Sequence, residues 1–93
     1  MKNMTAIPQR TIFLADDDAD DCMLFEDALK ELCSDTSLVT ARDGVELMNM
    51  LASSTPPPAV IFLDLNMPRK NGFECLSEIK LSKKLKLLPV IVF

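Results

Sequence analysis

The sequence predicts an α/β fold built on a parallel β-sheet. Short apolar runs alternate strictly with segments that have helical periodicity, and no internal repeat or low-complexity stretch interrupts this order. Such alternation is typical of parallel sheets, because right-handed crossover helices connect neighbouring parallel strands. The predicted order is strand, helix, strand, helix, strand, helix, strand, and ligands of such open sheets bind outside the carboxyl ends of the strands.

Residues 11–15 (TIFLA) form the first predicted strand, an apolar and partly β-branched run that stops at three aspartates. This pattern is typical of a strand that is buried on both faces. Residues 19–33 form the first predicted helix. Its apolar residues recur at steps of three and four, which places them on a single face: Cys22, Phe25, Leu29 and Leu32.

The middle of the chain repeats the pattern more briefly. Residues 37–41 are a second strand candidate, the Asp43-Gly44 dipeptide supplies a turn, and residues 45–52 suggest a short helix. Residues 53–58 (SSTPPP) are expected to be a loop, because prolines lack amide donors and exclude helical geometry from the preceding residue.

Residues 59–63 (AVIFL) are the cleanest strand, and Asp64 follows them directly. Asn, Pro and Gly residues then mark an irregular connection, which leads to a helix over residues 73–81 with Phe73, Leu76 and Ile79 at helical spacing. Pro89 precedes the last apolar run, residues 90–93, which is the fourth predicted strand.

Composition excludes several classes of protein. The 93 residues fit one domain, and 48% hydrophobic and 26% charged residues suit a globular chain. A net charge of −4 argues against direct binding of nucleic acid. The few clustered basic residues are expected on a solvated helix end and loop: Lys80, Lys83, Lys84 and Lys86.

Cysteine usage and hydropathy point to the cytoplasm. The three cysteines lack Cys-x-x-Cys spacing and the chain has no histidine, so we expect reduced core thiols and no zinc site: Cys22, Cys33 and Cys75. The first ten residues lack the apolar stretch of a secretory signal, and no apolar run approaches the roughly 20 residues that span a bilayer. We expect no membrane partner.

Two strands end in acidic residues, and this carries the functional prediction. Asp16 and Asp17 follow the first strand and Asp64 follows the third, so parallel pairing brings their carboxylates to one edge of the sheet. Like charges at close range repel unless a cation intervenes. Oxygen ligands without His or Cys favour Mg²⁺, and a carboxylate beside the ion is able to attack phosphorus and form an aspartyl phosphate.

Simpler interpretations of these aspartates stay open at this point. Asp18, Asp20 and Asp21 precede or begin a helix, where aspartate caps free amides and complements the helix dipole, so we do not expect them to be ligands. On spacing and strand context alone, Asp16, Asp17 and Asp64 are also compatible with loop carboxylates that have no function, although a metal site is favoured.

Two segments resemble a known family. The run FLADDDADD resembles the first strand and acidic loop of response-regulator receiver domains, and VIFLDLNMPRKNGFE resembles their phosphoacceptor segment. The resemblance covers residues 11–93, with residues 1–10 as an N-terminal extension. It implies the flavodoxin-like, doubly wound parallel sheet of the receiver type. Single-domain receivers and receivers associated with phytochrome-like kinases have a similar acidic run.

The resemblance also implies roles for individual residues. Asp64 falls on the phosphorylated aspartate, Asp16 and Asp17 fall on the metal-binding acidic pair, and Asn66 falls where the family supplies a backbone carbonyl to Mg²⁺. Pro68 and Gly72 resemble residues that shape the loop after the phosphoacceptor. A sensor histidine kinase or a histidine phosphotransfer protein is the implied phosphoryl donor in a two-component pathway, and the domain is an acceptor with at most slow autodephosphorylation, not an enzyme.

The sequence departs from the family at its end. A complete receiver continues past the fourth strand to a hydroxyl residue and further to a lysine, so βαβαβαβ is present here and the final αβα is missing. We therefore expect a C-terminally truncated receiver whose fourth strand is an exposed edge and self-associates. Phe25 and Leu29 are expected to lose part of their cover.

Three other functions compete with this prediction. An aspartate-nucleophile phosphatase needs Asp-x-Asp, whereas Asp64-Leu65-Asn66 lacks the second acid. A receiver-like interaction module that is never phosphorylated fits the missing hydroxyl and lysine, although the retained acidic residues argue against it. A nucleotide-binding protein is disfavoured, because no Gly-rich loop follows the first strand.

Overall fold

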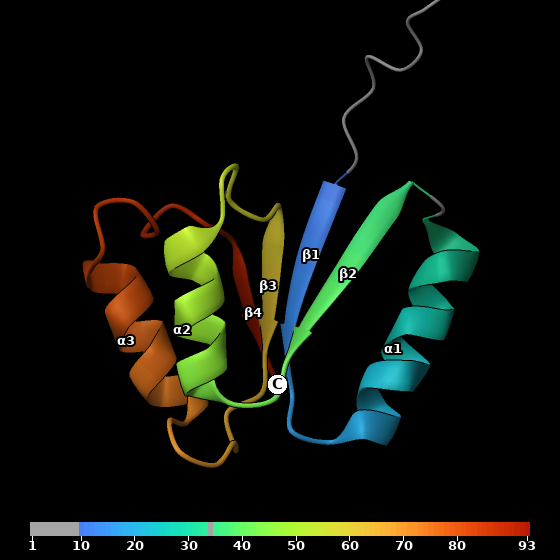
Figure 1. The fold of residues 1–93 in the computed structure, drawn as a ribbon, viewed down its shortest axis with the longest axis horizontal. Coiled ribbons are helices and arrows are strands. Elements are labelled where there is room, and N and C mark those ends of the chain that lie inside the picture. The colour runs from blue at the N-terminus through green and yellow to red at the C-terminus, as the bar shows by residue number, and fades with distance from the viewer. Residues whose placement is uncertain (1–9, 34) are drawn as a thin grey trace, which may run out of the picture.

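A computed structural model describes residues 10–33 and 35–93, which form one four-stranded sheet flanked by three helices (Figure 1). The element order predicted from sequence is confirmed, with ends that differ by one residue. Of the predicted N-terminal extension, residues 1–9 lie outside the described residues, and Arg10 already belongs to the first strand. The elements are β1 (Arg10–Ala15), α1 (Ala19–Leu32), β2 (Thr36–Ala41), α2 (Gly44–Ser53), β3 (Val60–Leu63), α3 (Gly72–Leu81) and β4 (Val90–Val92).

All strand pairs are parallel, and the strand order is β2-β1-β3-β4. The chain steps from β1 to one side to form β2, and then crosses to the other side to form β3 and β4. The strand order therefore reverses between β1 and β3, which is the point where ligands bind in doubly wound sheets. All four strands end at the lower edge of the sheet as drawn in Figure 1.

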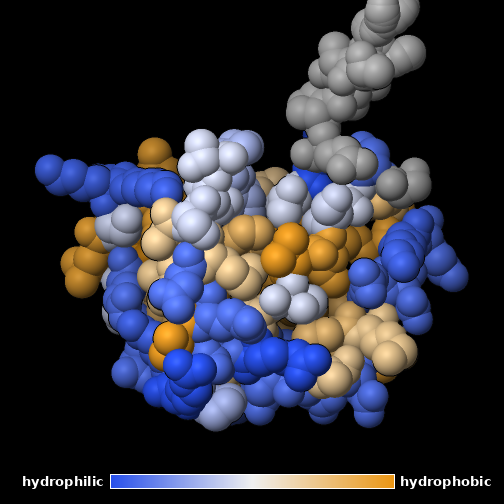
Figure 2. Space-filling view, in the orientation of Figure 1, coloured by the Kyte–Doolittle hydropathy of each residue, from blue (hydrophilic) through white to orange (hydrophobic). Residues whose placement is uncertain are grey.

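The two faces of the sheet are covered unequally. Phe13 and Ala15 of β1 pack with buried residues of α2 and α3, among them Leu47 and Ile79, in the main core. Among the described elements, only α1 covers the opposite face, where the Phe25 ring meets the Phe62 ring edge-on at 4.9 Å. Figure 2 shows apolar side chains gathered between α2 and α1, and hydrophilic ones along the border where the strands end.

Side-chain caps fix where each helix begins. The Asp18 carboxylate accepts hydrogen bonds from the amides of Asp20 and Asp21, so its predicted capping role is confirmed. Asp43 caps α2 by accepting from the Glu46 amide. Asn71 caps α3 in a reciprocal box with Glu74. Each cap follows a strand-end loop, so the helix N-termini are held at the ligand-binding edge of the sheet.

Helical spacing does not coincide with burial at every position. Leu32, the last residue of α1, is 82% exposed, while Phe25 and Leu29 are half-buried as expected. Phe73 is 62% exposed, since Cys75 and Ile79 form the buried stripe of α3.

The cysteine prediction was correct for two thiols of three. All three cysteines are free, and Cys22 and Cys75 are buried, whereas Cys33 is exposed at the C-cap of α1. The four clustered lysines are exposed as predicted, and the Lys84 ammonium donates to the carbonyls of Leu51 and Ala52 at the end of α2. No helix in the described ranges has the length and apolar character that a membrane span requires.

Gly72 allows α3 to begin in close contact with the backbone that follows β3. A Cβ at this position would lie 2.4 Å from the carbonyl oxygen of Asp64 and 2.7 Å from the Cα of Leu65. The Gly72 amide donates to the Leu65 carbonyl at 3.2 Å, which closes the loop between β3 and α3. The glycine is needed for close approach, because its φ is not positive.

We predict that Gly72→Ala destabilises the fold by about 1–3 kcal/mol, the usual range for overpacking against atoms that cannot move away. Urea unfolding followed by far-UV circular dichroism measures the change. Ser77→Ala, on the exposed side of the same helix, is the control and should change stability by no more than about 0.5 kcal/mol. Equal stability of Gly72→Ala and the unaltered chain would show that the loop is free to move away from α3.

Candidate functional site

Three carboxylates meet where β1 and β3 end. Asp16, Asp17 and Asp64 each offer an oxygen, and these three oxygens lie within 4.8 Å of one another. Asp16 is buried, Asp17 is exposed and Asp64 is half-buried. The sequence prediction that these residues come together is therefore confirmed in geometry.

The sheet itself produces this convergence. β1 pairs with β3 in a register that sets Ala15 opposite Leu63, so the residues that follow them emerge together. The Asp64 amide donates to the Ala15 carbonyl at 2.9 Å, and the Asp16 amide donates to the Ala41 carbonyl of β2 at 3.0 Å. Backbone hydrogen bonds thus hold both aspartates before any ligand arrives.

The electrostatics of Asp16 are unfavourable in the absence of a cation. Asp16 is only 2% exposed, and this burial is the main cause that raises the pKa of its carboxyl group above the ordinary value of 3.8. The negative charges of Asp64, Asp21 and Asp17 raise this pKa further. The Asp18 amide, which donates to Asp16 Oδ1 at 3.0 Å, opposes the rise.

Asp64 begins the loop that links β3 to α3. The Asn66 amide donates to Asp64 Oδ1 at 2.9 Å, which fixes the carboxylate relative to the loop backbone. Asn66 is exposed, whereas Met67 is buried and anchors the loop in the core.

The donor set suits a hard divalent cation. The three clustered donors are all carboxylate oxygens, and the chain contains no histidine. Cations with this preference include Mg²⁺ and Mn²⁺, which carboxylate ligands hold together with waters. A cation in this position would offset the mutual repulsion of the three carboxylates. The residues present therefore fit a divalent metal ion.

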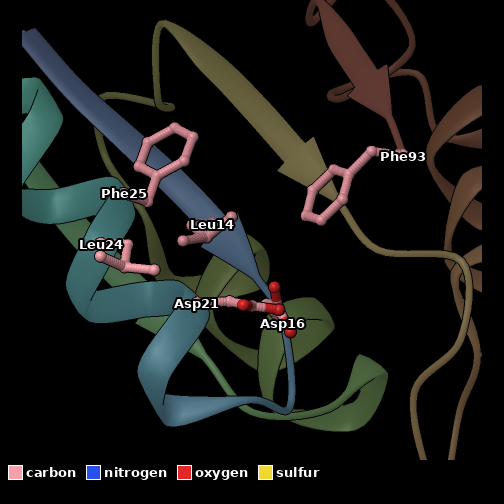
Figure 3. A pocket seen from close by; sticks show the side chains of 6 residues that line it. All are labelled: Leu14, Asp16, Asp21, Leu24, Phe25 and Phe93. Atoms are coloured by element: carbon pink, nitrogen blue, oxygen red, sulfur yellow. The ribbon is translucent and has the colours of Figure 1, made fainter.

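An apolar hollow of about 290 Å³ adjoins the acidic cluster (Figure 3). Asp16 and Asp21 lie at one end of it, and apolar side chains of α1, β1 and the segment after β4 form the rest: Leu14, Leu24, Phe25 and Phe93. The Phe25 and Phe93 rings lie on opposite sides of Leu14. The hollow therefore lies between α1 and Phe93, the residue that follows β4.

Sequence reasoning missed one group that touches the loop after Asp64. Arg69 Nη1 lies 3.0 Å from Asp43 Oδ2, so the loop is tied to the start of α2. The Asp43-Gly44 dipeptide by itself predicts only a turn. The Asp-x-x-Glu pattern from Asp43 to Glu46 did carry a capping signal, but no local pattern indicates the partner 26 residues away.

Comparison with known sequences decides the family. Residues 12–93 match the family described as "Response regulator receiver domain". The chain belongs to this family. Receiver domains are the phosphoacceptor modules of two-component signalling; they bind a divalent metal and interact with histidine kinases or phosphotransfer proteins.

Individual relatives agree with this assignment. The response regulator Rcp1 of Synechocystis is 39% identical over 90 residues, which cover 91% of this receiver and 61% of Rcp1. The phosphorylated cyanobacterial phytochrome response regulator RcpA superposes with a TM-score of 0.85 at 39% identity, covering 91% of this receiver and 64% of RcpA. The Mn²⁺-bound form of Rcp1 superposes with a TM-score of 0.82, covering 89% of this receiver and 63% of Rcp1.

This receiver sequence therefore spans about three fifths of its curated relative Rcp1. The flavodoxin-like receiver fold is also shared with the bacteriophytochrome response regulator AtBRR, at a TM-score of 0.84 and 34% identity over 91% of this receiver and 66% of AtBRR. The predicted fold class is confirmed for the four strands and three helices that the structure describes.

We predict that Asp16→Asn raises the melting temperature of the receiver at pH 7 in the presence of a chelator. The amide removes a buried negative charge and keeps an oxygen for the Asp18 amide. The difference should shrink as the pH falls, because a carboxyl group with a raised pKa takes up a proton early and the unaltered receiver then gains stability.

Excess Mg²⁺ should reverse this order, because an ion that binds only the folded state stabilises it by mass action. The unaltered receiver is expected to gain more in melting temperature than Asp16→Asn. Asp27→Asn, an exposed change in the middle of α1, is the control and should leave the Mg²⁺ effect intact. A lower melting temperature of Asp16→Asn in chelator would contradict the repulsion inferred here.

Proposed function

We propose that Asp64 is the phosphoacceptor of this receiver, and that Asp16, Asp17, Asp64 and the backbone carbonyl of Asn66 hold Mg²⁺ beside it. The observation that carries the proposal is the meeting of three carboxylates at the β1 and β3 ends. A sensor histidine kinase or a histidine phosphotransfer protein is the proposed donor. The cytoplasm is the proposed location, and no direct contact with nucleic acid or membrane is proposed.

The chemistry assigned to Asp64 is a single phosphoryl transfer. Its second carboxylate oxygen attacks phosphorus, a P–O bond forms, the P–N bond of the donor phosphohistidine breaks, and the electron pair stays on the imidazole nitrogen. Bound Mg²⁺ would neutralise charge on the phosphoryl oxygens. Asp64 Oδ1 is held by the Asn66 amide, so the carboxylate keeps its orientation during the attack.

The remaining acids serve the proposed site differently. Asp16 is buried and fixed by backbone contacts, which suits a permanent ligand, while exposed Asp17 adjusts at little cost. No general acid is assigned beside Asp64, since Asn66 stands where the Asp-x-Asp pattern of a phosphatase has its second acid. The domain is accordingly proposed to retain one phosphoryl group, with slow autodephosphorylation at most, and not to turn over substrates.

We predict that a small acyl phosphate with Mg²⁺ adds one phosphoryl group to the receiver, and that Asp64→Asn prevents this. Intact-mass spectrometry, followed by borohydride reduction and peptide mapping, measures the adduct and its position. Asp27→Asn is the control and should label like the unaltered receiver, whereas a chelator should abolish labelling.

Equal labelling of Asp64→Asn and the unaltered receiver would remove Asp64 from the acceptor role. Absence of both labelling and metal binding would favour the alternative function, a receiver-like interaction module that is never phosphorylated. Continuous release of phosphate from the acyl phosphate in excess of the protein would instead indicate a phosphatase.

We also propose that a polypeptide of these 93 residues self-associates through β4. This strand lies at the edge of the sheet, and Ile91, Val92 and Phe93 are 49%, 43% and 54% exposed. An apolar edge with unpaired backbone groups invites pairing with another chain.

Light scattering at micromolar concentration should therefore give a mass above that of one chain. Ile91→Lys places a charge on the edge, which natural sheets use to prevent pairing, and should shift the population toward the monomer. A monomeric mass for the unaltered polypeptide would contradict association through β4.

A further inference from the structure

The ion pair between Arg69 and Asp43 connects the loop after the proposed phosphoacceptor to the start of α2. Arg69 Nη1 lies 3.0 Å from Asp43 Oδ2, and the Asp43 side chain is only 12% exposed. The other carboxylate oxygen, Oδ1, accepts from the Glu46 amide at 2.8 Å. Asp43 is thus fixed by its own helix, and it offers the loop arginine an immobile partner.

The loop backbone is constrained at the same place. Arg69 has a φ of 66°, in the left-handed region that a residue with a Cβ adopts only when its surroundings hold it there. The next residue, Lys70, accepts a hydrogen bond from the Gly44 amide at 3.0 Å. The contact is close, since a Cβ on Gly44 would lie 2.1 Å from the Lys70 carbonyl oxygen.

These contacts lie only a few residues from the acidic cluster. Asn66, whose carbonyl is a proposed ligand, lies three residues before Arg69, and its amide contacts Asp64 Oδ1. The far end of the loop is closed by the Gly72 amide on the Leu65 carbonyl. The path of the loop past the metal site is therefore set by where Arg69 and Lys70 are held.

We propose that Arg69 is a positioning residue for the cation site: its pair with Asp43 holds the loop in the conformation that presents Asp64 and the Asn66 carbonyl to a divalent cation. This inference rests on the proposed function of the acidic cluster. The pair acts before the cation arrives, so it contributes preorganisation, and its loss should appear as weaker metal binding.

A purely electrostatic effect of Arg69 has the opposite sign. A guanidinium near the site repels a divalent cation, so removing its charge would tighten metal binding if charge alone mattered. Positioning predicts weaker binding on removal of the same charge. The sign of the change in affinity therefore separates the two effects.

The test is a Mn²⁺ titration of the full chain, with the free ion counted by electron paramagnetic resonance. Arg69→Gln and Asp43→Asn should each raise the dissociation constant about tenfold, at the lower end of the range for residues that orient metal ligands. Asp43→Asn keeps an oxygen for the Glu46 amide, so the helix cap survives. The double variant should bind no more weakly than the weaker single variant, because both changes remove one interaction.

Two further variants control for charge and geometry. Arg42→Gln removes a positive charge from the end of β2 at the same border of the sheet, and it should leave the affinity unchanged or increase it. Arg69→Lys keeps the charge without the planar guanidinium, and should restore part of the affinity lost in Arg69→Gln. Circular dichroism at the titration temperature checks that every variant is folded.

Unchanged or tighter Mn²⁺ binding by folded Arg69→Gln, with normal binding by the unaltered chain, overturns the positioning role alone. Weaker binding by Asp43→Asn does not rescue the role in that case, because loss of a negative charge weakens cation binding by itself. Failure of the unaltered chain to bind Mn²⁺ overturns the proposed metal site and this inference together. Weaker binding by both single variants, without a further loss in the double variant, supports the positioning role.

Discussion

The parallel pairing of β1 with β3 is the constraint on which the site depends. It brings two strand ends together at the point where the strand order reverses, and each strand is followed directly by an aspartate. Asp16 is buried there among other carboxylates, an arrangement that opposes folding unless a cation compensates the charge.

Helix caps and closely packed glycines stabilise the loops at the same edge of the sheet. Asp18, Asp43 and Asn71 each cap a helix that starts near a strand end, so the three loops at this border are anchored where they enter a helix. Gly44 and Gly72 allow two of these loops to approach backbone carbonyls closely. The acidic cluster therefore rests on rigid elements, which is what a site needs in order to bind a small cation without rearrangement.

Much of this could be predicted from the sequence, because the decisive signals are local. Strand ends are visible where an apolar run meets Asp16 or Asp64, and the parallel sheet follows from the alternation of elements. Exposure was less predictable. Phe73 and Leu32 follow helical spacing, yet Cys75 and Ile79 form the buried stripe of α3, and Leu32 is an exposed last residue of α1. The ion pair between Arg69 and Asp43 could not be predicted from the sequence, because no sequence pattern indicates that an arginine adopts the left-handed conformation.

Anomalous diffraction from crystals grown with Mn²⁺ locates the cation directly. We expect one strong anomalous peak within coordination distance of carboxylate oxygens from Asp16, Asp17 and Asp64. A peak elsewhere, or carboxylates that point away from one another in the electron density, would contradict the view that the ends of β1 and β3 form a cation site.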